Sequence, residues 1–139
     1  MKSFILSTAF LIGAVCGFGF SSDAQAASIA NQTVEAHLTW IQGPRLDAES
    51  ILDLQFVDSE TQQPTILTDE LKVTVFMPMM GHGSSPTTIT ALKDASGKLI
   101  PGAYQVSKIY FTMGGEWEIH IMLKNADGTS QTQTVKVNL

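Results

Sequence analysis

Cysteine and basic residues are both scarce in this sequence, and each shortage excludes certain kinds of site or partner. The single cysteine, Cys16, lies in an apolar N-terminal run. If that run is removed, disulfides, thiolate zinc sites and cysteine nucleophiles are all excluded. The 8 Lys and Arg residues against 13 Asp and Glu residues give a net charge of −5. An acidic chain is a poor match for nucleic acid or for an anionic membrane surface, so neither is expected as a partner.

Catalytic motifs are also missing. The sequence has no G-x-S-x-G elbow, no H-E-x-x-H and no phosphate-binding glycine loop before a helix. His82 stands close to Ser84, but no carboxylate is indicated as a third partner, so the pair is weak support for a hydrolase. We therefore do not expect an enzyme.

The N-terminus has the features of an export signal. Lys2 supplies a positive charge, residues 4–20 are apolar, and Ala24-Gln25-Ala26 matches a signal-peptidase site. We expect residues 1–26 to be a signal peptide, residues 27–139 to form the exported domain, and the location to be the periplasm. The apolar run is close to the roughly 20 residues that span a bilayer, so an uncleaved membrane anchor is the alternative. Val15 is a poor lipobox residue before Cys16, which disfavours lipid attachment.

Alternating apolar and polar residues, which are typical of strands, recur along the exported part of the chain. The predicted strands cover residues 34–40, 52–56, 71–77, 87–92, 104–111, 116–123 and 135–139. Residues 113–115, between the fifth and sixth of these, have the length of a hairpin loop. Within residues 116–123, Trp117 and every second residue after it should face the core. About seven short strands predict an all-β fold, an immunoglobulin-like β-sandwich in one domain.

The most unusual stretch is a short turn rich in sulfur. Met77, Met79, Met80 and His82 fall within six residues. Pro78 should end the preceding strand, and the glycines on either side of His82 should let the backbone curl and bring the side chains together. Thioethers and imidazole are soft or borderline donors that suit Cu(I) much better than Mg, Ca or Mn. The turn therefore predicts a copper site.

A second loop adds a further candidate ligand. Met113 follows a predicted strand, as the Met/His turn does, and the loops of a sandwich gather at its two ends. Met113 is therefore a candidate third or fourth ligand. The alternative is that Met113 is an apolar cap beside Trp117 and that the whole Met-rich turn is an adaptable contact surface without metal.

Two other histidines lie on predicted strands. His120 and Met122 share one strand face about 7 Å apart, so they are a candidate second soft-metal pair. A histidine and a methionine are, however, more often found on a sheet face with no ligand role. His37 falls on the polar face of residues 34–40, and a surface or edge position is expected for it.

The chain resembles the FixH/YtkA-like family. The resemblance lies in the segments Met-Pro-Met-Met-Gly-His-Gly at 77–83, Gly-Ala-Tyr at 102–104 and Phe-Thr-Met-Gly-Gly-Glu-Trp-Glu-Ile at 111–119. It implies a small immunoglobulin-like sandwich outside the cytoplasm that is associated with copper handling. FixH-type members are linked to copper supply for cbb3-type oxidases. By this resemblance the site residues are Met77, Met79, Met80, His82 and Met113. FixH proteins keep a membrane anchor, whereas this chain has the pattern of a cleavable signal.

Together these observations favour a periplasmic Cu(I)-binding carrier or chaperone. Its expected partners are the copper ion and a periplasmic or membrane copper-handling protein, and no membrane span is expected after cleavage. The alternative is an exported, metal-free interaction module that binds a membrane or periplasmic partner through the Met-rich loop.

Overall fold

The computed structural model describes residues 25–28, 34–68, 70–124 and 126–139. Residues 1–24 of the predicted signal peptide lie outside this part. The last two residues of the predicted signal peptide, Gln25 and Ala26, belong to a short strand.

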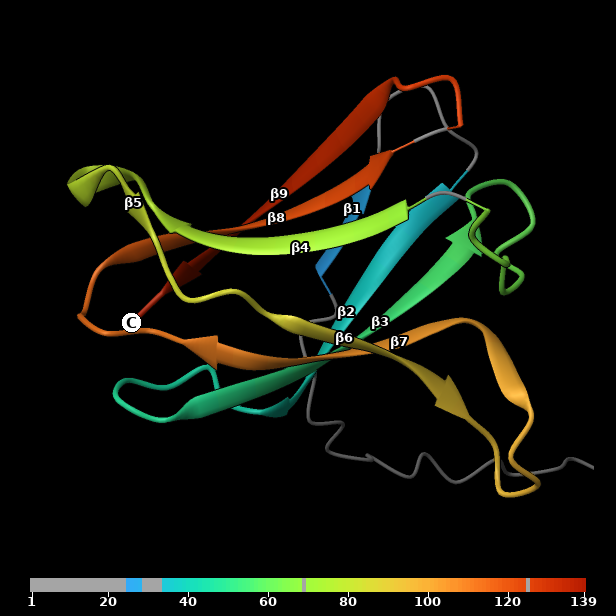
Figure 1. Cartoon of the computed structure of the whole chain (residues 1–139), viewed down its shortest axis with the longest axis horizontal. Coiled ribbons are helices and arrows are strands. Elements are labelled where there is room, and N and C mark those ends of the chain that lie inside the picture. Colours follow the sequence, from blue (N-terminus) through green and yellow to red (C-terminus); the bar gives the residue numbers. More distant parts are fainter. Residues whose placement is uncertain (1–24, 29–33, 69, 125) are drawn as a thin grey trace, which may run out of the picture.

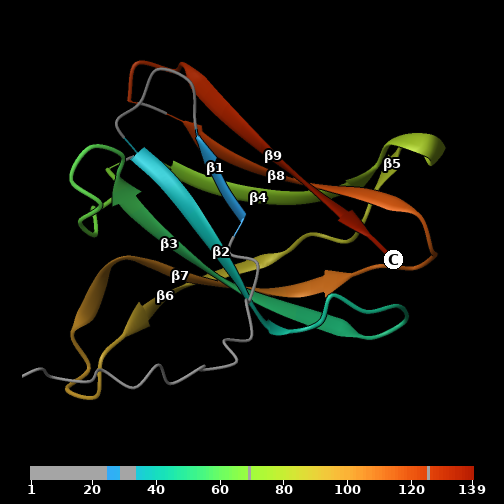
Figure 2. The ribbon, with the colours of Figure 1, turned by 180° about the vertical axis from the view of Figure 1, so that it is seen from behind.

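Two antiparallel sheets pack face to face, which confirms the predicted all-β sandwich (Figures 1 and 2). One sheet has the order β1-β2-β3-β7-β6, and the other has the order β5-β4-β8-β9. The strands of the first sheet are β1 (Gln25–Ser28), β2 (Val34–Gln42), β3 (Glu49–Asp58), β6 (Thr88–Lys93) and β7 (Leu99–Tyr110). Those of the second are β4 (Glu70–Met77), β5 (His82–Gly83), β8 (Glu116–Lys124) and β9 (Ser130–Asn138). A short 3-10 helix, η1 (Pro78–Met80), lies between β4 and β5.

The seven predicted strands correspond to β2, β3, β4, β6, β7, β8 and β9. The described part of the chain adds β1 and β5, which were not predicted. β5 has only two residues, too few to show an alternating pattern. β7 also begins earlier than predicted, at Leu99, and continues through Pro101 and Gly102, residues that normally interrupt strands.

The core lies between the sheets and follows the predicted alternation. Trp117, Ile119, Ile121 and Leu123 on β8 are all completely buried. The Trp117 ring meets the ring of Phe111 edge to face, with the centroids 5.5 Å apart. This aromatic pair joins the two sheets at one end of the sandwich.

Residues 113–115 have the length of a hairpin loop, but the loop at residues 111–115 does not close a hairpin. β7 belongs to the first sheet and β8 to the second, so the loop crosses from one sheet to the other. Phe111 before the crossing and Trp117 after it are both fully buried and pack edge to face between the two sheets.

Candidate metal centre

The Met/His turn is closed by backbone geometry that the sequence predicts. Met77 is extended with φ −110°, and Pro78 opens η1. Gly81 ends η1 in the left-handed region at φ +66° and donates its N–H to the carbonyls of Met77 (3.0 Å) and Pro78 (3.2 Å). Because glycine adopts this conformation without strain, the chain reverses within four residues and starts β5 at once.

The reversal places His82 directly opposite Met77. The two residues are register partners in the β4–β5 pair, so their side chains leave the same face of the sheet. Side chains of directly opposed residues have Cβ atoms roughly 4.5–5.5 Å apart. Met77 is 3% exposed and belongs to the hydrophobic core, whereas His82 is exposed. A buried thioether and an exposed imidazole therefore lie next to each other at the rim of the core.

Met79 and Met80 lie on the tip of the turn. Their exposed fractions are 82% and 55%, and η1 has no buried residue. Both thioethers are therefore open to solvent within a few residues of the Met77–His82 pair.

The β7–β8 loop, which carries Met113, contacts this turn through Met77. A Cβ atom on Gly115 would lie 3.0 Å from Met77 Cε, so the loop backbone packs against the end of the Met77 side chain. η1 also packs against β8. Figures 1 and 2 show the η1–β5 tip and the β7–β8 loop at the same end of the sandwich. Met113 is two residues from Gly115 and 38% exposed, so it belongs to the loop that contacts the turn.

Hydrogen bonds hold the β7–β8 loop in place. The indole Nε1–H of Trp117 donates to the Met113 carbonyl at 2.9 Å. Gly115 and Leu139 exchange two backbone hydrogen bonds, of 2.9 and 3.1 Å. These anchors were not identified from the sequence, although the Gly-Gly pair at 114–115 was a signal of close backbone approach. They give the Met113 backbone a fixed position.

The segment after β5 is tied to the opposite sheet. The Ser84 hydroxyl donates to the Tyr110 carbonyl at 2.7 Å, and the Ser84 N–H donates to the Val75 carbonyl at 2.8 Å. The Ser84 hydroxyl is thus engaged with the backbone and not with His82. Its role in this structure is to fix the exit from the Met/His turn.

The donor set depends on sulfur. Within the described residues, no group of three or more His, Cys, Asp or Glu side chains is placed to hold a metal ion. A metal bound at this end of the sandwich would therefore use thioethers together with His82. Such a set favours Cu(I) over hard cations, which prefer oxygen ligands.

The other histidines have different surroundings. His120 Nε2 lies 2.9 Å from Glu118 Oε2, and its ring is 5.8 Å from that of Phe76. His37 Nε2 lies 3.5 Å from Glu35 Oε1, on the outer face of β2. β2 has β1 and β3 as neighbours, so His37 is on a sheet face and not on an edge.

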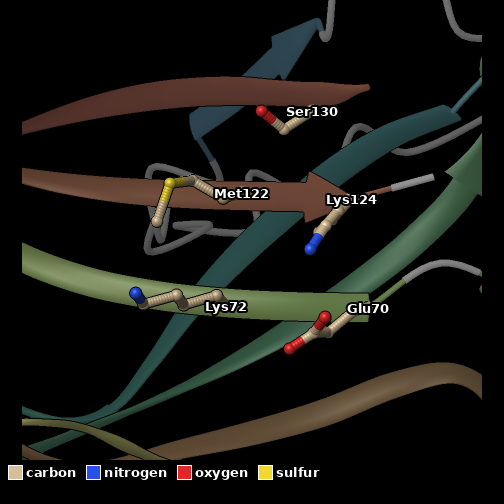
Figure 3. Close-up of a pocket in the computed structure, with 5 residues that line it drawn as sticks. All are labelled: Glu70, Lys72, Met122, Lys124 and Ser130. Atoms are coloured by element: carbon tan, nitrogen blue, oxygen red, sulfur yellow. The ribbon is translucent and has the colours of Figure 1, made fainter. Parts of the chain in front are cut away.

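Met122, the suggested partner of His120, lines a shallow surface depression on the outer face of the second sheet. Figure 3 shows Met122 beside Lys72 of β4, its register partner, and Lys124 farther along β8, with Glu70 and Ser130 nearby. Two ammonium groups beside the thioether disfavour a bound cation through charge repulsion. This face is therefore the weaker of the two candidate metal sites.

Comparison with known proteins assigns the chain to a family. The YtkA-like family matches residues 30–122, from just before β2 to within β8, which is more than half of the chain. The chain belongs to the YtkA-like family. The match includes the Met/His turn and the Met113 loop and ends before β9. Neither the curated proteins nor the solved structures gave a match.

Within the described ranges, this YtkA-like chain has no helix that is long and apolar enough to cross a membrane.

Proposed function

We propose that this YtkA-like protein is an exported, periplasmic carrier of Cu(I). Copper would bind at the end of the sandwich to His82 and to the thioethers of Met79 and Met80, with Met113 completing the set from the neighbouring loop. Met77 would supply a fifth, buried sulfur beneath His82. The observation that carries the proposal is the register of β4 and β5, which pairs His82 with Met77 on either side of a turn that exposes Met79 and Met80.

The exposure of the site favours transfer over permanent storage. Met79, Met80 and His82 are all accessible from solvent, so an acceptor protein can reach the ion while it is still held. Thioethers are neutral ligands and hold Cu(I) in an exchangeable way. A periplasmic or membrane copper-handling protein is the partner that this chemistry suits.

The test is an anaerobic Cu(I) titration against a competing chromophoric chelator. We expect one tight equivalent for the wild-type protein and an affinity at least about tenfold lower after His82→Ala or Met79→Leu/Met80→Leu, because each change removes donors from the set. His120→Ala and Met122→Leu are the matched controls, since they remove the same donor types from the outer sheet face. Absence of competition by the wild type would refute the copper carrier.

A second function is favoured by the exposed apolar residues at this end. Besides the methionines, Leu46 is 42% exposed and Tyr110 is 37% exposed. Leu46 forms a β-bridge with Phe111, so it lies beside the β7–β8 loop. An exported interaction module would use this apolar surface to bind a partner without metal. In that case His82→Ala would leave partner binding unchanged, and chelators would have no effect on it.

A further inference from the structure

The methionines differ sharply in their access to solvent. Met79 and Met80 are 82% and 55% exposed, and Met113 is 38% exposed. Met77 is 3% exposed, with its terminal methyl group against Gly115. Oxidation of a thioether follows its exposure, so the same turn contains sulfurs that are open to oxidants and one that is shielded.

The exposed sulfurs can also change without disturbing the fold. η1 has no buried residue, so an oxygen atom added to Met79 or Met80 enters solvent and displaces no core side chain. Adding an oxygen to Met77 would instead place a polar group in the hydrophobic core, which is costly. Met79 and Met80 are therefore both accessible to oxidants and able to take up an oxygen atom without disturbing the core.

We propose that Met79 and Met80 are sites of reversible oxidation by peroxides. The thioether sulfur attacks one oxygen of hydrogen peroxide, an S–O bond forms, the O–O bond breaks, and water leaves. Sulfur loses two electrons and becomes the sulfoxide, while the peroxide is reduced. A methionine sulfoxide reductase reverses the change with two thiols, which become a disulfide as the oxygen leaves as water.

The modification changes the ligand chemistry of the turn. A sulfoxide offers a hard oxygen in place of a soft sulfur, and Cu(I) prefers the sulfur. Oxidation of Met79 and Met80 would thus release copper while Met77 and His82 stay in place. This consequence rests on the proposed copper-carrier function, whereas the oxidation itself does not.

The oxidation is tested on the purified metal-free protein with stepwise additions of hydrogen peroxide. Met77, Met79 and Met80 fall in one tryptic peptide between Lys72 and Lys93, so fragment ions assign the sulfoxide to each residue. We expect Met79 and Met80 to oxidise at least about tenfold faster than Met77, with Met113 in between, because the order follows exposure. The circular dichroism spectrum and the melting temperature should stay close to those of the untreated protein. Equal rates for Met77 and Met79, or unfolding upon oxidation of the turn, would overturn the proposal.

A second measurement separates this inference from the copper carrier. The oxidised protein is titrated with Cu(I), before and after treatment with methionine sulfoxide reductase and dithiothreitol. We expect oxidation to lower the affinity at least about tenfold and the reductase to restore it. Met122→Leu protein should behave as the wild type. In Met79→Leu/Met80→Leu protein only the less exposed Met113 sulfur is left to react, so oxidation should lower the affinity much less than in the wild type. Failure of the untreated protein to bind Cu(I) would refute the carrier alone, whereas unchanged affinity after oxidation would refute the switch alone.

Discussion

Met77 and His82 face each other across the β4–β5 pair, one side chain buried and the other exposed. The pairing exists because Pro78 and Gly81 close a four-residue turn between them. A thioether that is part of the core is held in one place, and it lies next to an imidazole that solvent can reach. Packing in the core and the proposed ligation of copper can therefore be tested separately at Met77.

Two substitutions at Met77 separate those roles. Met77→Ala should lower the free energy of unfolding by about 2–5 kcal/mol because it leaves a cavity in the core. Met77→Leu should cost less than about 1.5 kcal/mol because it conserves volume, while it removes the sulfur. Urea unfolding measures the first effect and Cu(I) titration the second. Full copper affinity in the Met77→Leu protein would remove Met77 from the ligand set.

Copper affinity should depend on pH through His82. A ring nitrogen of imidazole binds a metal only while it carries no proton, so protons compete with the metal for a histidine ligand. Thioethers do not take up protons, so we expect Cu(I) affinity to weaken as the pH falls and the loss to depend on His82. The His82→Ala protein should bind weakly with no such slope. A wild-type affinity that is the same at pH 5 and pH 7 would argue against ligation by His82.

Trp117 should control the position of Met113. Trp117→Phe removes the indole N–H that donates to the Met113 carbonyl at 2.9 Å. The free energy of unfolding should fall by about 1–3 kcal/mol from the lost hydrogen bond and the smaller ring. Cu(I) affinity should fall several-fold as the loop loses its anchor. Trp40→Phe is the control, since Trp40 also packs edge to face on Phe111 but leaves the Met113 carbonyl bonded. Equal copper affinities in the two variants would contradict the positioning role.

Two glycine substitutions should differ strongly in their effect on stability. Gly102 has φ +67°, and a Cβ atom there would collide with the Thr65 carbonyl and lie 2.6 Å from the Phe56 carbonyl. Gly102→Ala should therefore cost more than about 2 kcal/mol. Gly97 has φ +84° with nothing within 4 Å of its Cβ position, so Gly97→Ala should cost only about 1 kcal/mol. Thermal unfolding of both variants measures the difference, and similar melting temperatures would show that the backbone at Gly102 moves aside.

The turn after β6 should have an unusually acidic carboxyl group. The Ser96 hydroxyl at 2.6 Å and the Lys98 N–H at 3.0 Å, with further backbone donors, lower the pKa of Asp94 below 3.8. Because the folded pKa is the lower one, the stability that Asp94 contributes is present above about pH 3.8 and is lost as the pH falls through the folded pKa. Ser96→Ala should move the pKa of Asp94 back toward 3.8. NMR titration of the carboxyl group measures the change, and an unaltered pKa would show that the hydroxyl is not the main cause.

Much of the fold could be predicted because the strands are buried on one face. Alternation along residues 116–123 identified Trp117, Ile119, Ile121 and Leu123 as core residues, and all four are fully buried. Alternation does not reveal which strand lies beside which, because it depends only on the face that each residue takes. That is why residues 113–115 suggested a hairpin where the chain in fact crosses between sheets.

The residue types of the candidate site could be predicted from the sequence more fully than their arrangement in space. Residue types alone suggested the candidate donors, and Pro78 and Gly81 indicated the turn. The pairing of His82 with Met77 depends on β5, whose two residues have no sequence pattern to detect. The anchoring of the Met113 loop depends on Trp117 and Leu139, which are distant from each other in sequence and meet only after the sheets have packed.

The paired hydrogen bonds between Gly115 and Leu139 have a practical consequence for purification. Residue 139 lies beside the β7–β8 loop, at the same end of the sandwich as the Met/His turn (Figure 1). A hexahistidine tag fused after Leu139 would therefore bring extra imidazoles next to Met113, and the tag would compete for copper or add to the bound count. Removing such a tag before titration limits the measured stoichiometry to the donors of the protein itself.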